Sequence, residues 1–333
     1  MKTALLADPA MPSEFDLIQQ FFTRPTPSAV LGVGDDAALL LVSAGKLLAV
    51  SSDMLVAGRH FLPDADPYLL GHKTLAVNLS DLAAMGATPR WATLALALPA
   101  VDETWLSAFS RGFFDLADRF GVELIGGDTT AGPLNLCVTI FGETDVRPLR
   151  RDAAQPGDDI WVSGDLGGAA LGLAHLQGET VLNDNDAAAC LARLHRPEPR
   201  VVLGLALAAL PRIAAIDVSD GLLADLGHIL ERSAVGAEIA MASLPAHPAL
   251  QPMLPESLPD SDLARRCLLA GGDDYELCFT APAQDAPAVH AAAMTAGVAV
   301  SRVGRITLSP ELRVLDQKGV QLPIKERGFD HFA

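Results

Sequence analysis

Four short segments of this chain place aspartates beside glycine or beside a second aspartate, and each lies next to an apolar run. The segments are GDD at 34–36, GGD at 126–128, DVSD at 217–220 and GGDD at 271–274. Carboxylates gathered at strand ends repel one another unless they are protonated or neutralised by a cation. Oxygen ligands without a His/Cys set suit Mg²⁺ or another hard divalent ion. The repetition predicts an α/β fold whose strand ends surround such an ion.

The segment 34–53, GDDAALLLVSAGKLLAVSSD, predicts half of this metal site. Apolar runs at 37–42 and 47–50 are separated by 43–46, which is the pattern of two strands joined by a turn. Such a hairpin would bring the acids at its outer ends close together. For this segment alone, acids in two solvated turns are the commoner alternative, and only the recurrence along the chain favours a metal site.

Residues 31–37, LGVGDDA, also offer the GxGxxA pattern of a dinucleotide-binding turn. That pattern requires a glycine-rich turn that opens a helix toward a pyrophosphate. Here two carboxylates would face the phosphate and the next residues favour a strand. The glycines are better explained as allowing the backbone to bring Asp35 and Asp36 to a metal.

A largely apolar helix is predicted over residues 67–86, with Pro67 in its first turn and Gly86 at its end. Asn78, Ser80 and Asp81 are polar residues inside this apolar segment, and burying them is costly unless each has a partner. For Asp81, a capping or turn role and a bound cation are both open at this point.

The rest of the chain alternates strand and helix patterns, and its length of 333 residues suits two domains. We expect an α/β (α+β) fold with mixed sheets covered by helices, divided into residues 1–150 and 151–333. Besides the segments above, the expected strands are 91–98, 134–141, 158–164 and 213–216, and the expected helices are 13–22, 103–120, 167–176 and 222–231. Residues 122–132 are expected to form a strand followed by a glycine-rich turn.

Composition excludes several classes of protein. The net charge of −17 would repel nucleic acid, so phosphates would have to be bound through metal ions, backbone amides and a few arginines. No apolar stretch reaches the roughly 20 residues of a membrane helix, and the first residues do not resemble a signal peptide. The four cysteines form no CxxC motif, which argues against a zinc site and fits a reducing compartment. We therefore expect a cytoplasmic protein.

Six motifs together resemble the thiamine-monophosphate kinase family of the aminoimidazole ribonucleotide synthetase-like ATP-binding superfamily. They are GVGDDAALL, SSDMLVAGRHF, KTLAVNLSDLAAMGATPRW, LIGGDTT, IDVSDGL and GGDDYELCF, and the resemblance covers nearly the whole chain. It implies a two-domain aminoimidazole ribonucleotide synthetase-like fold and ATP-dependent phosphorylation of thiamine monophosphate to thiamine diphosphate. It also implies several Mg²⁺ ions and a homodimer paired through the N-terminal domains.

The resemblance assigns roles to individual residues. Where some relatives have glutamate in the last motif, this chain has Asp273, which is one methylene shorter. The metal positions are Asp36, Ser51, Ser52, Asp53, Asp81, Asp128, Asp217 and Asp220; the ATP positions are Gly127, Asp128, Arg151 and Ser219; the substrate positions are His60, Asp273 and Phe329.

Two other functions stay open at the level of sequence. A non-catalytic nucleotide or metal sensor would keep the ATP and metal positions but would not need the substrate set. A related ATP-dependent synthetase would act on another acceptor. The chain has no Walker loop, no protein-kinase motif set and no GxSxG nucleophile elbow. Ser219 lies between two acids with no histidine-type base close in sequence, and a dianionic phosphate acceptor is already nucleophilic, so we expect direct in-line phosphoryl transfer without a covalent intermediate.

Overall fold

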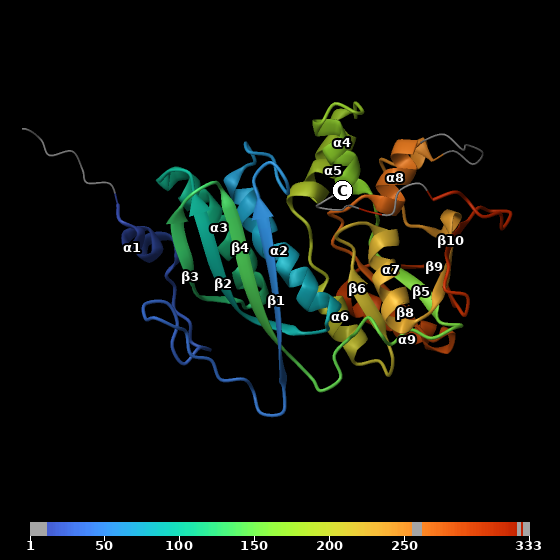
Figure 1. The fold of residues 1–333 in the computed structure, drawn as a ribbon, viewed down its shortest axis with the longest axis horizontal. Coiled ribbons are helices and arrows are strands. Elements are labelled where there is room, and N and C mark those ends of the chain that lie inside the picture. Colours follow the sequence, from blue (N-terminus) through green and yellow to red (C-terminus); the bar gives the residue numbers. More distant parts are fainter. Residues whose placement is uncertain (1–11, 255–261, 325–327, 329–333) are drawn as a thin grey trace, which may run out of the picture.

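A computed structural model of the chain describes residues 12–254, 262–324 and 328. Its strands form two sheets, one in each half of the chain, and helix α2 (Pro67–Ala84) lies between them (Figure 1). Both sheets combine parallel and antiparallel pairs, and helices pack on them. The expected fold of mixed sheets covered by helices is confirmed.

The first sheet has four strands, and the two outermost come from opposite ends of the N-terminal half. In spatial order they are β1 (Leu47–Val56), β4 (Asn135–Thr144), β2 (Thr88–Leu98) and β3 (Glu123–Ala131). In β4, buried residues alternate with partly exposed ones, as expected when a sheet buries only one face. The sheet therefore has a covered face and an open face.

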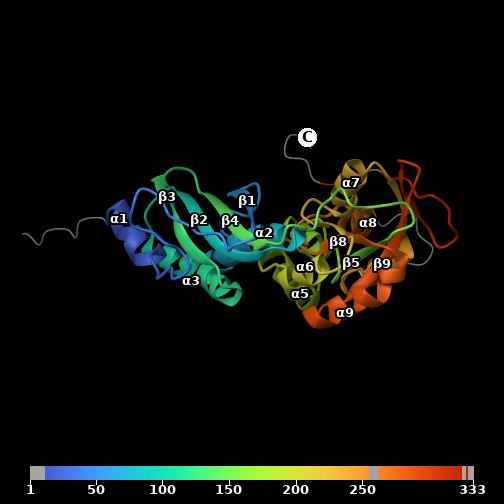
Figure 2. The same ribbon diagram turned by 90° about the horizontal axis from the view of Figure 1, so that it is seen from below.

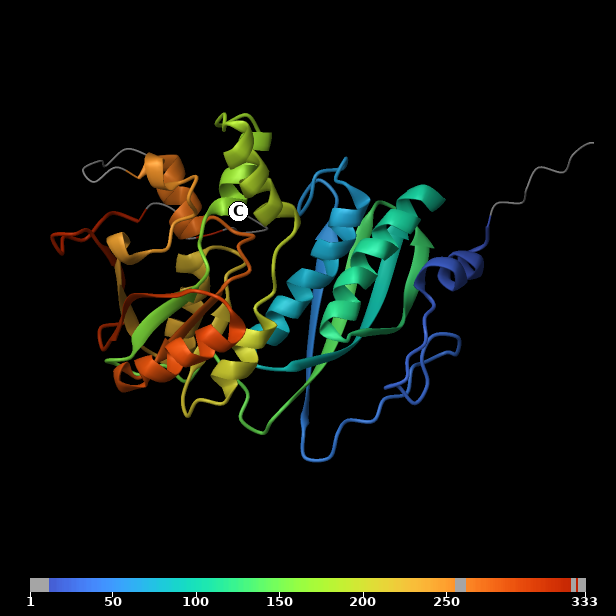
Figure 3. The same cartoon turned by 180° about the vertical axis from the view of Figure 1, so that it is seen from behind.

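Helices α2 and α3 (Glu103–Phe120) pack on each other and cover one face of this sheet (Figure 3). Helix α3 begins where Asp102 accepts hydrogen bonds from the backbone N–H groups of Thr104 and Trp105, and it ends at Gly121 with a left-handed φ of 66°. Figure 1 looks onto the other face, over which no helix of the described chain lies. The short helices α1 (Glu14–Leu17) and η1 (Ile18–Phe22) lie beside β3.

The hairpin predicted from 37–42 and 47–50 is wrong. Residues 37–42 form no strand; only an isolated bridge joins Leu39 to Leu31. Strand β1 instead pairs along its whole length with β4, some 90 residues away in the sequence. The apolar run at 37–42 fits a strand by its composition, but no neighbouring strand edge accepts its hydrogen bonds, and Leu41 stays 76% exposed.

The second sheet has six strands, and two neighbouring ones, β5 and β8, are buried along their whole length. In spatial order they are β10 (Leu312–Leu315), β7 (Gly236–Ala240), β9 (Val300–Thr307), β5 (Asp159–Ser163), β8 (Leu277–Ala281) and β6 (Ala214–Asp217). The segments 217–220 and 271–274, which carry two of the acidic motifs, adjoin β6 and β8. This edge of the sheet faces α2.

Helices surround the second sheet on several sides (Figure 2). The two prolines of the segment RPEPR separate α5 from α6, as the sequence predicts. The helices are α4 (Gly168–Leu176), α5 (Asp184–His195), α6 (Val201–Ala208), α7 (Leu222–Ser233), α8 (Asp262–Ala270) and α9 (Ala286–Ala296), with short 3-10 turns η2 (Met241–Ser243), η3 (Gln251–Met253) and η4 (Ala283–Asp285).

One hydrophobic core continues from the first half into the second. It includes Leu75 and Leu79 of α2 together with Trp161 and Phe279 of the second sheet. Helix α2 is buried along most of its length because it packs on both sheets. In the described residues no helix is long and apolar enough to cross a membrane.

Candidate active site

The polar residues embedded in α2 have partners on both sides of the helix. The amide oxygen of Asn78 accepts a hydrogen bond from the backbone N–H of Asp53, at 3.1 Å. The hydroxyl of Ser80 donates to Asp217 at 2.7 Å, and the hydroxyl of Ser51 donates to Asp81 at 2.5 Å. Helix α2 therefore joins strand β1 of the first sheet to the end of β6 in the second, and its polar residues are satisfied despite burial.

A cavity of about 470 Å³ opens at this junction. It is bordered by β1, α2, the helix pair α4 and α5, and the two acidic loops of the second half. Seven of the residues assigned by resemblance line it: Asp53, His60, Asp81, Asp217, Ser219, Asp220 and Asp273. The fold thus brings metal, nucleotide and substrate positions from four separate motifs to one place.

Three carboxylates that line the cavity, Asp53, Asp81 and Asp217, have raised pKa values, and burial is the main cause for each. Burial raises the pKa of Asp53 to about 7, and the charges of Asp81 and Asp220 add to the rise. Burial also raises the pKa of Asp217 well above its ordinary value, with Asp81 the next cause. For Asp81 burial raises the pKa, while the hydrogen bond from Ser51 and the charge of Arg151 oppose it. Such a group ionises readily only when a cation is added.

The chemistry of this donor set fits Mg²⁺. In the described part of the chain, no group of three His, Cys, Asp or Glu side chains is close enough to hold a metal ion by itself. Mg²⁺ keeps several waters and is commonly bound through one or two carboxylates together with substrate phosphates. A site in which single carboxylates surround a space for phosphates therefore fits Mg²⁺, even though no three described side chains form a complete ligand set.

The loop DVSDGL is held by a carboxylate that lies outside its motif. Asp225 on α7 accepts hydrogen bonds from the backbone N–H groups of Ser219 and Asp220, at 3.0 and 3.1 Å. Burial raises its pKa to about 7, although these two hydrogen bonds act in the opposite direction. Asp225 thus fixes the turn that carries Ser219 and Asp220 toward the cavity. Arg151 is exposed, but it is near enough to lower the pKa of both Asp81 and Asp225.

Two substrate positions, His60 and Asp273, also line this cavity. The Nδ1 atom of His60 accepts a hydrogen bond from the backbone N–H of Val56 at 3.0 Å, so the ring carries its proton on Nε2. The Asp273 carboxylate is 3.0 Å from the ammonium group of Lys73, a buried residue on α2. Phe329 lies outside the described residues.

The structure separates four assigned residues from this cavity. Gly127 and Asp128 lie inside strand β3, not in a turn as the sequence predicts. Gly127 has a φ of 150°, and a Cβ there would lie 1.8 Å from the carbonyl oxygen of Leu94 on β2, so only glycine fits. Asp36 is exposed in the loop before β1, and the hydroxyl of Ser52 contacts Thr139 of β4. These assignments stay predictions.

The register of the first sheet shows how far Asp128 lies from Asp53 of the cavity. Asp128 on β3 is paired with Ala95, Ala95 with Cys137, and Cys137 with Met54 of β1, the neighbour of Asp53. Three strand spacings correspond to about 14 Å. Asp53 faces α2, whereas Asp128 is exposed on the edge strand.

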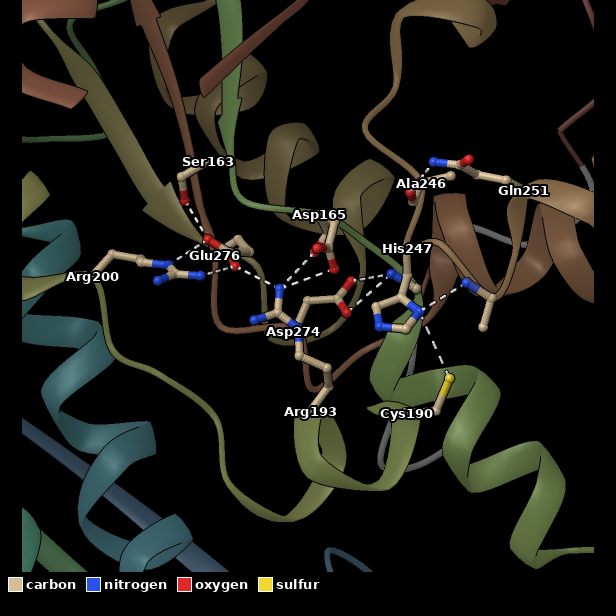
Figure 4. A network of polar contacts seen from close by, with 12 residues as sticks. Ser163, Asp165, Cys190, Arg193, Arg200, Ala246, His247, Gln251, Asp274 and Glu276 are labelled. Carbon is tan, nitrogen blue, oxygen red and sulfur yellow. Dashed lines mark hydrogen bonds and ion pairs between the residues drawn. The ribbon is translucent and has the colours of Figure 1, made fainter. Parts of the chain in front are cut away.

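Sequence reasoning missed Lys73, Asp225 and the buried network around Glu276. For Lys73 a signal was present, since residues 73, 77 and 81 are spaced at helical intervals and line the cavity together. Glu276 is fully buried and is paired with Arg193 and Arg200, with a hydrogen bond from Ser163 (Figure 4). These arginines tie α5 and the start of α6 to the last acidic loop. No local pattern predicts this pairing.

Comparison with known proteins identifies the class to which this fold and site belong. Residues 34–144 match the family model "AIR synthase related protein, N-terminal domain", and residues 155–317 match the corresponding C-terminal domain model. A thiamine-monophosphate kinase of Escherichia coli O157:H7 is 47% identical over 326 residues, covering 96% of this chain and 98% of that protein. The chain belongs to the thiamine-monophosphate kinase family of AIR synthase related proteins.

Solved structures support the same relationship. The crystal structure of thiamine-monophosphate kinase from Stenotrophomonas maltophilia K279a superposes with a TM-score of 0.80 at 51% identity, covering 86% of this chain and 91% of that one. A structure of AaThiL complexed with AMPPCP and TMP superposes with a TM-score of 0.74 at 29% identity, covering 88% and 89%. The fold implied by the sequence motifs is therefore confirmed.

Proposed function

We propose that this chain transfers the γ-phosphoryl group of ATP to thiamine monophosphate, giving thiamine diphosphate and ADP. The observation that carries the proposal is the cavity in which Asp53, Asp81 and Asp217 meet the substrate positions His60 and Asp273. Membership of the kinase family and the relative bound to AMPPCP and TMP support it. A non-catalytic sensor would have no use for the substrate-side residues.

The acceptor needs little activation by the protein. A phosphate monoester has a second pKa near 6, so it is mostly dianionic at neutral pH and is already nucleophilic. The chain's task is to hold two anionic groups in line and to exclude water. Ser219 and Arg151 are proposed to bind the nucleotide, and His60 and Asp273 to orient the acceptor.

We further propose that the cavity carboxylates Asp53, Asp81, Asp217 and Asp220 hold Mg²⁺. When bound, the ions would bridge phosphate oxygens and offset their negative charge. The raised pKa values of Asp53 and Asp217 support this assignment, because burial and, after it, the neighbouring carboxylates disfavour their ionised forms, and a bound cation would offset both effects. The four cysteines are free thiols, which fits a reducing compartment, and we propose that the protein acts in the cytoplasm.

The test of this function is an assay with ATP, Mg²⁺ and a series of phosphorylated acceptors. Only thiamine monophosphate should make ADP release substrate-dependent, with thiamine diphosphate as the second product. Protein incubated with γ-labelled ATP and Mg²⁺ alone should retain no label after denaturation. ADP release that follows another acceptor would favour the related synthetase, and stoichiometric label that is chased into thiamine diphosphate would refute direct transfer.

We also propose a homodimer that forms through the open face of the first sheet. Val50 and Met54 of β1 are 55% and 53% exposed there, and an uncovered apolar sheet face needs a partner. A single copy keeps Asp128 about 14 Å from the residue next to Asp53. A second copy packed on the open face would bring its own Asp128 near the first copy's cavity, so that each active site uses both chains.

Subunit mixing tests this arrangement. Asp53→Asn and Asp128→Asn should each abolish activity, because each removes one of the proposed metal ligands. If both chains build each site, unfolding and refolding the two variants together should restore about a quarter of the wild-type activity, since half of the dimers are mixed and each has one intact site. A mixture no more active than its components, or a monomer in light scattering, would contradict the shared site.

A further inference from the structure

Lys73 is a buried, positively charged residue of α2. The residue is 3% exposed, and its ammonium nitrogen is 3.0 Å from Oδ1 of Asp273. A buried lysine is unfavourable unless its charge is paired, so the position of Lys73 is tied to that of Asp273. The two residues are 200 positions apart and come from the two halves of the chain.

Lys73 lies about two turns of α2 from Asp81, one of the proposed metal ligands. Residues Lys73, Val77 and Asp81 follow one another at intervals of four along the same face of α2, and all three line the cavity. Eight residues of helix separate Lys73 from Asp81 by about 12 Å. Lys73 is therefore too far from Asp81 to share its task, and it instead contacts Asp273, a position assigned to the acceptor.

Its partner lies on a strained loop. Asp273 and Tyr275 both have left-handed backbones, with φ values of 67° and 49°, although neither is glycine. Backbone hydrogen bonds hold the loop from one side: the N–H of Asp273 donates to Ser219 and the N–H of Tyr275 to Val218, at 2.9 and 2.8 Å. These bonds fix the main chain but leave the Asp273 carboxylate to be oriented by its neighbours.

We propose that Lys73 is a positioning residue, which acts on the acceptor through Asp273. Its ammonium group directs the Asp273 carboxylate into the acceptor end of the cavity and links α2 to the strained loop. The inference rests on the proposed function, in which Asp273 contacts thiamine monophosphate. It assigns to α2 two separate tasks, with Asp81 at the phosphate end and Lys73 at the acceptor end.

The test is the substitution Lys73→Met, which keeps an unbranched side chain only one atom shorter and removes its charge. We expect the KM for thiamine monophosphate to rise about tenfold or more, because an interaction with a charged group is lost. The kcat and the KM for ATP should change much less. Equilibrium binding of thiamine monophosphate, measured by calorimetry, should weaken by the same factor as the KM.

A double-mutant cycle with Asp273→Asn separates positioning from other roles. If Lys73 acts through Asp273, Lys73→Met should add little to the KM in the Asp273→Asn background. The double variant leaves no unpaired buried charge, so it keeps the test valid even if Lys73→Met folds poorly. Lys46→Met is the matched control, since Lys46 pairs with Asp145 on the exposed surface at 2.7 Å and should leave all kinetic constants unchanged.

The outcomes distinguish this inference from the proposed function. Wild-type protein that does not phosphorylate thiamine monophosphate would refute the function itself. An active wild type with an unchanged or lowered KM in a folded Lys73→Met variant would overturn the inference, because Lys73 would then be structural or would compete with the substrate. Fully additive effects of the two substitutions on the KM would also overturn it.

Discussion

Replacing Asp81 with asparagine should lower the turnover of ATP and thiamine monophosphate by about a thousandfold, since stabilisation by a bound metal ion is worth several kcal/mol. Asparagine has nearly the same shape and can still accept the hydrogen bond that Ser51 donates at 2.5 Å. The substitution therefore removes the charge and little else. Steady-state assays across a range of Mg²⁺ concentrations would measure the loss.

Stability provides a second measurement on the same variant. Burial raises the pKa of Asp81, so its ionised form is unfavourable in the metal-free protein. Asp81→Asn should make the metal-free protein slightly more stable, and Mg²⁺ should raise its melting temperature less than that of the wild type. Asp66→Asn is the matched control on the same helix, because asparagine caps a helix as well as aspartate. Normal turnover and an unchanged Mg²⁺ requirement in Asp81→Asn would refute the metal role.

Replacing Glu276 with glutamine should cost about 3–5 kcal/mol of the free energy of unfolding, as is typical when one partner of a buried ion pair is removed. Glu276 is fully buried, with its carboxylate between Arg193 and Arg200 (Figure 4). Glutamine fills the same volume but leaves the charge of Arg200 without its partner and places an N–H group against an N–H donor. Urea unfolding followed by circular dichroism would measure the change.

The control for this experiment is Glu179→Gln. Glu179 pairs with Arg266 at 2.5 Å, but both side chains are substantially exposed, at 46% and 39%. Exposed ion pairs contribute little to stability, so this variant should unfold near the wild-type midpoint. Equal small effects of the two substitutions would show that the Glu276 network does not support the fold.

Much of the architecture could be predicted because its signals are local. Helices α2 and α3 begin at residues that favour a first turn, Pro67 and Glu103 after Asp102, and the expected range of α3 agrees with the structure. The break at RPEPR follows from the covalent geometry of proline. The acidic motifs could also be recognised in the sequence, because glycine and aspartate at the ends of apolar runs are distinctive. Their combination identified the family.

Strand partners could not be predicted in the same way. The run at 37–42 has the composition of a strand, yet the nearest in sequence, β1, pairs with β4 instead. A strand is completed by hydrogen bonds to another strand, and which edge is available depends on the whole sheet. For the same reason the sequence did not show that residues 126–128 lie inside β3. Asp128 is exposed there, away from the cavity in which its motif predicted a metal ligand.

The sequence by itself determined which residue types carry the chemistry and which family they belong to, since those are properties of short motifs. Only the tertiary structure decided which of them meet. It placed Asp53, Asp81 and Asp217 around one cavity, moved Asp128 to the far edge of the sheet, and paired Lys73 with Asp273 and Glu276 with two arginines. These contacts join residues far apart in the chain, and their energies come from burial and charge pairing, which exist only once the two halves pack on α2.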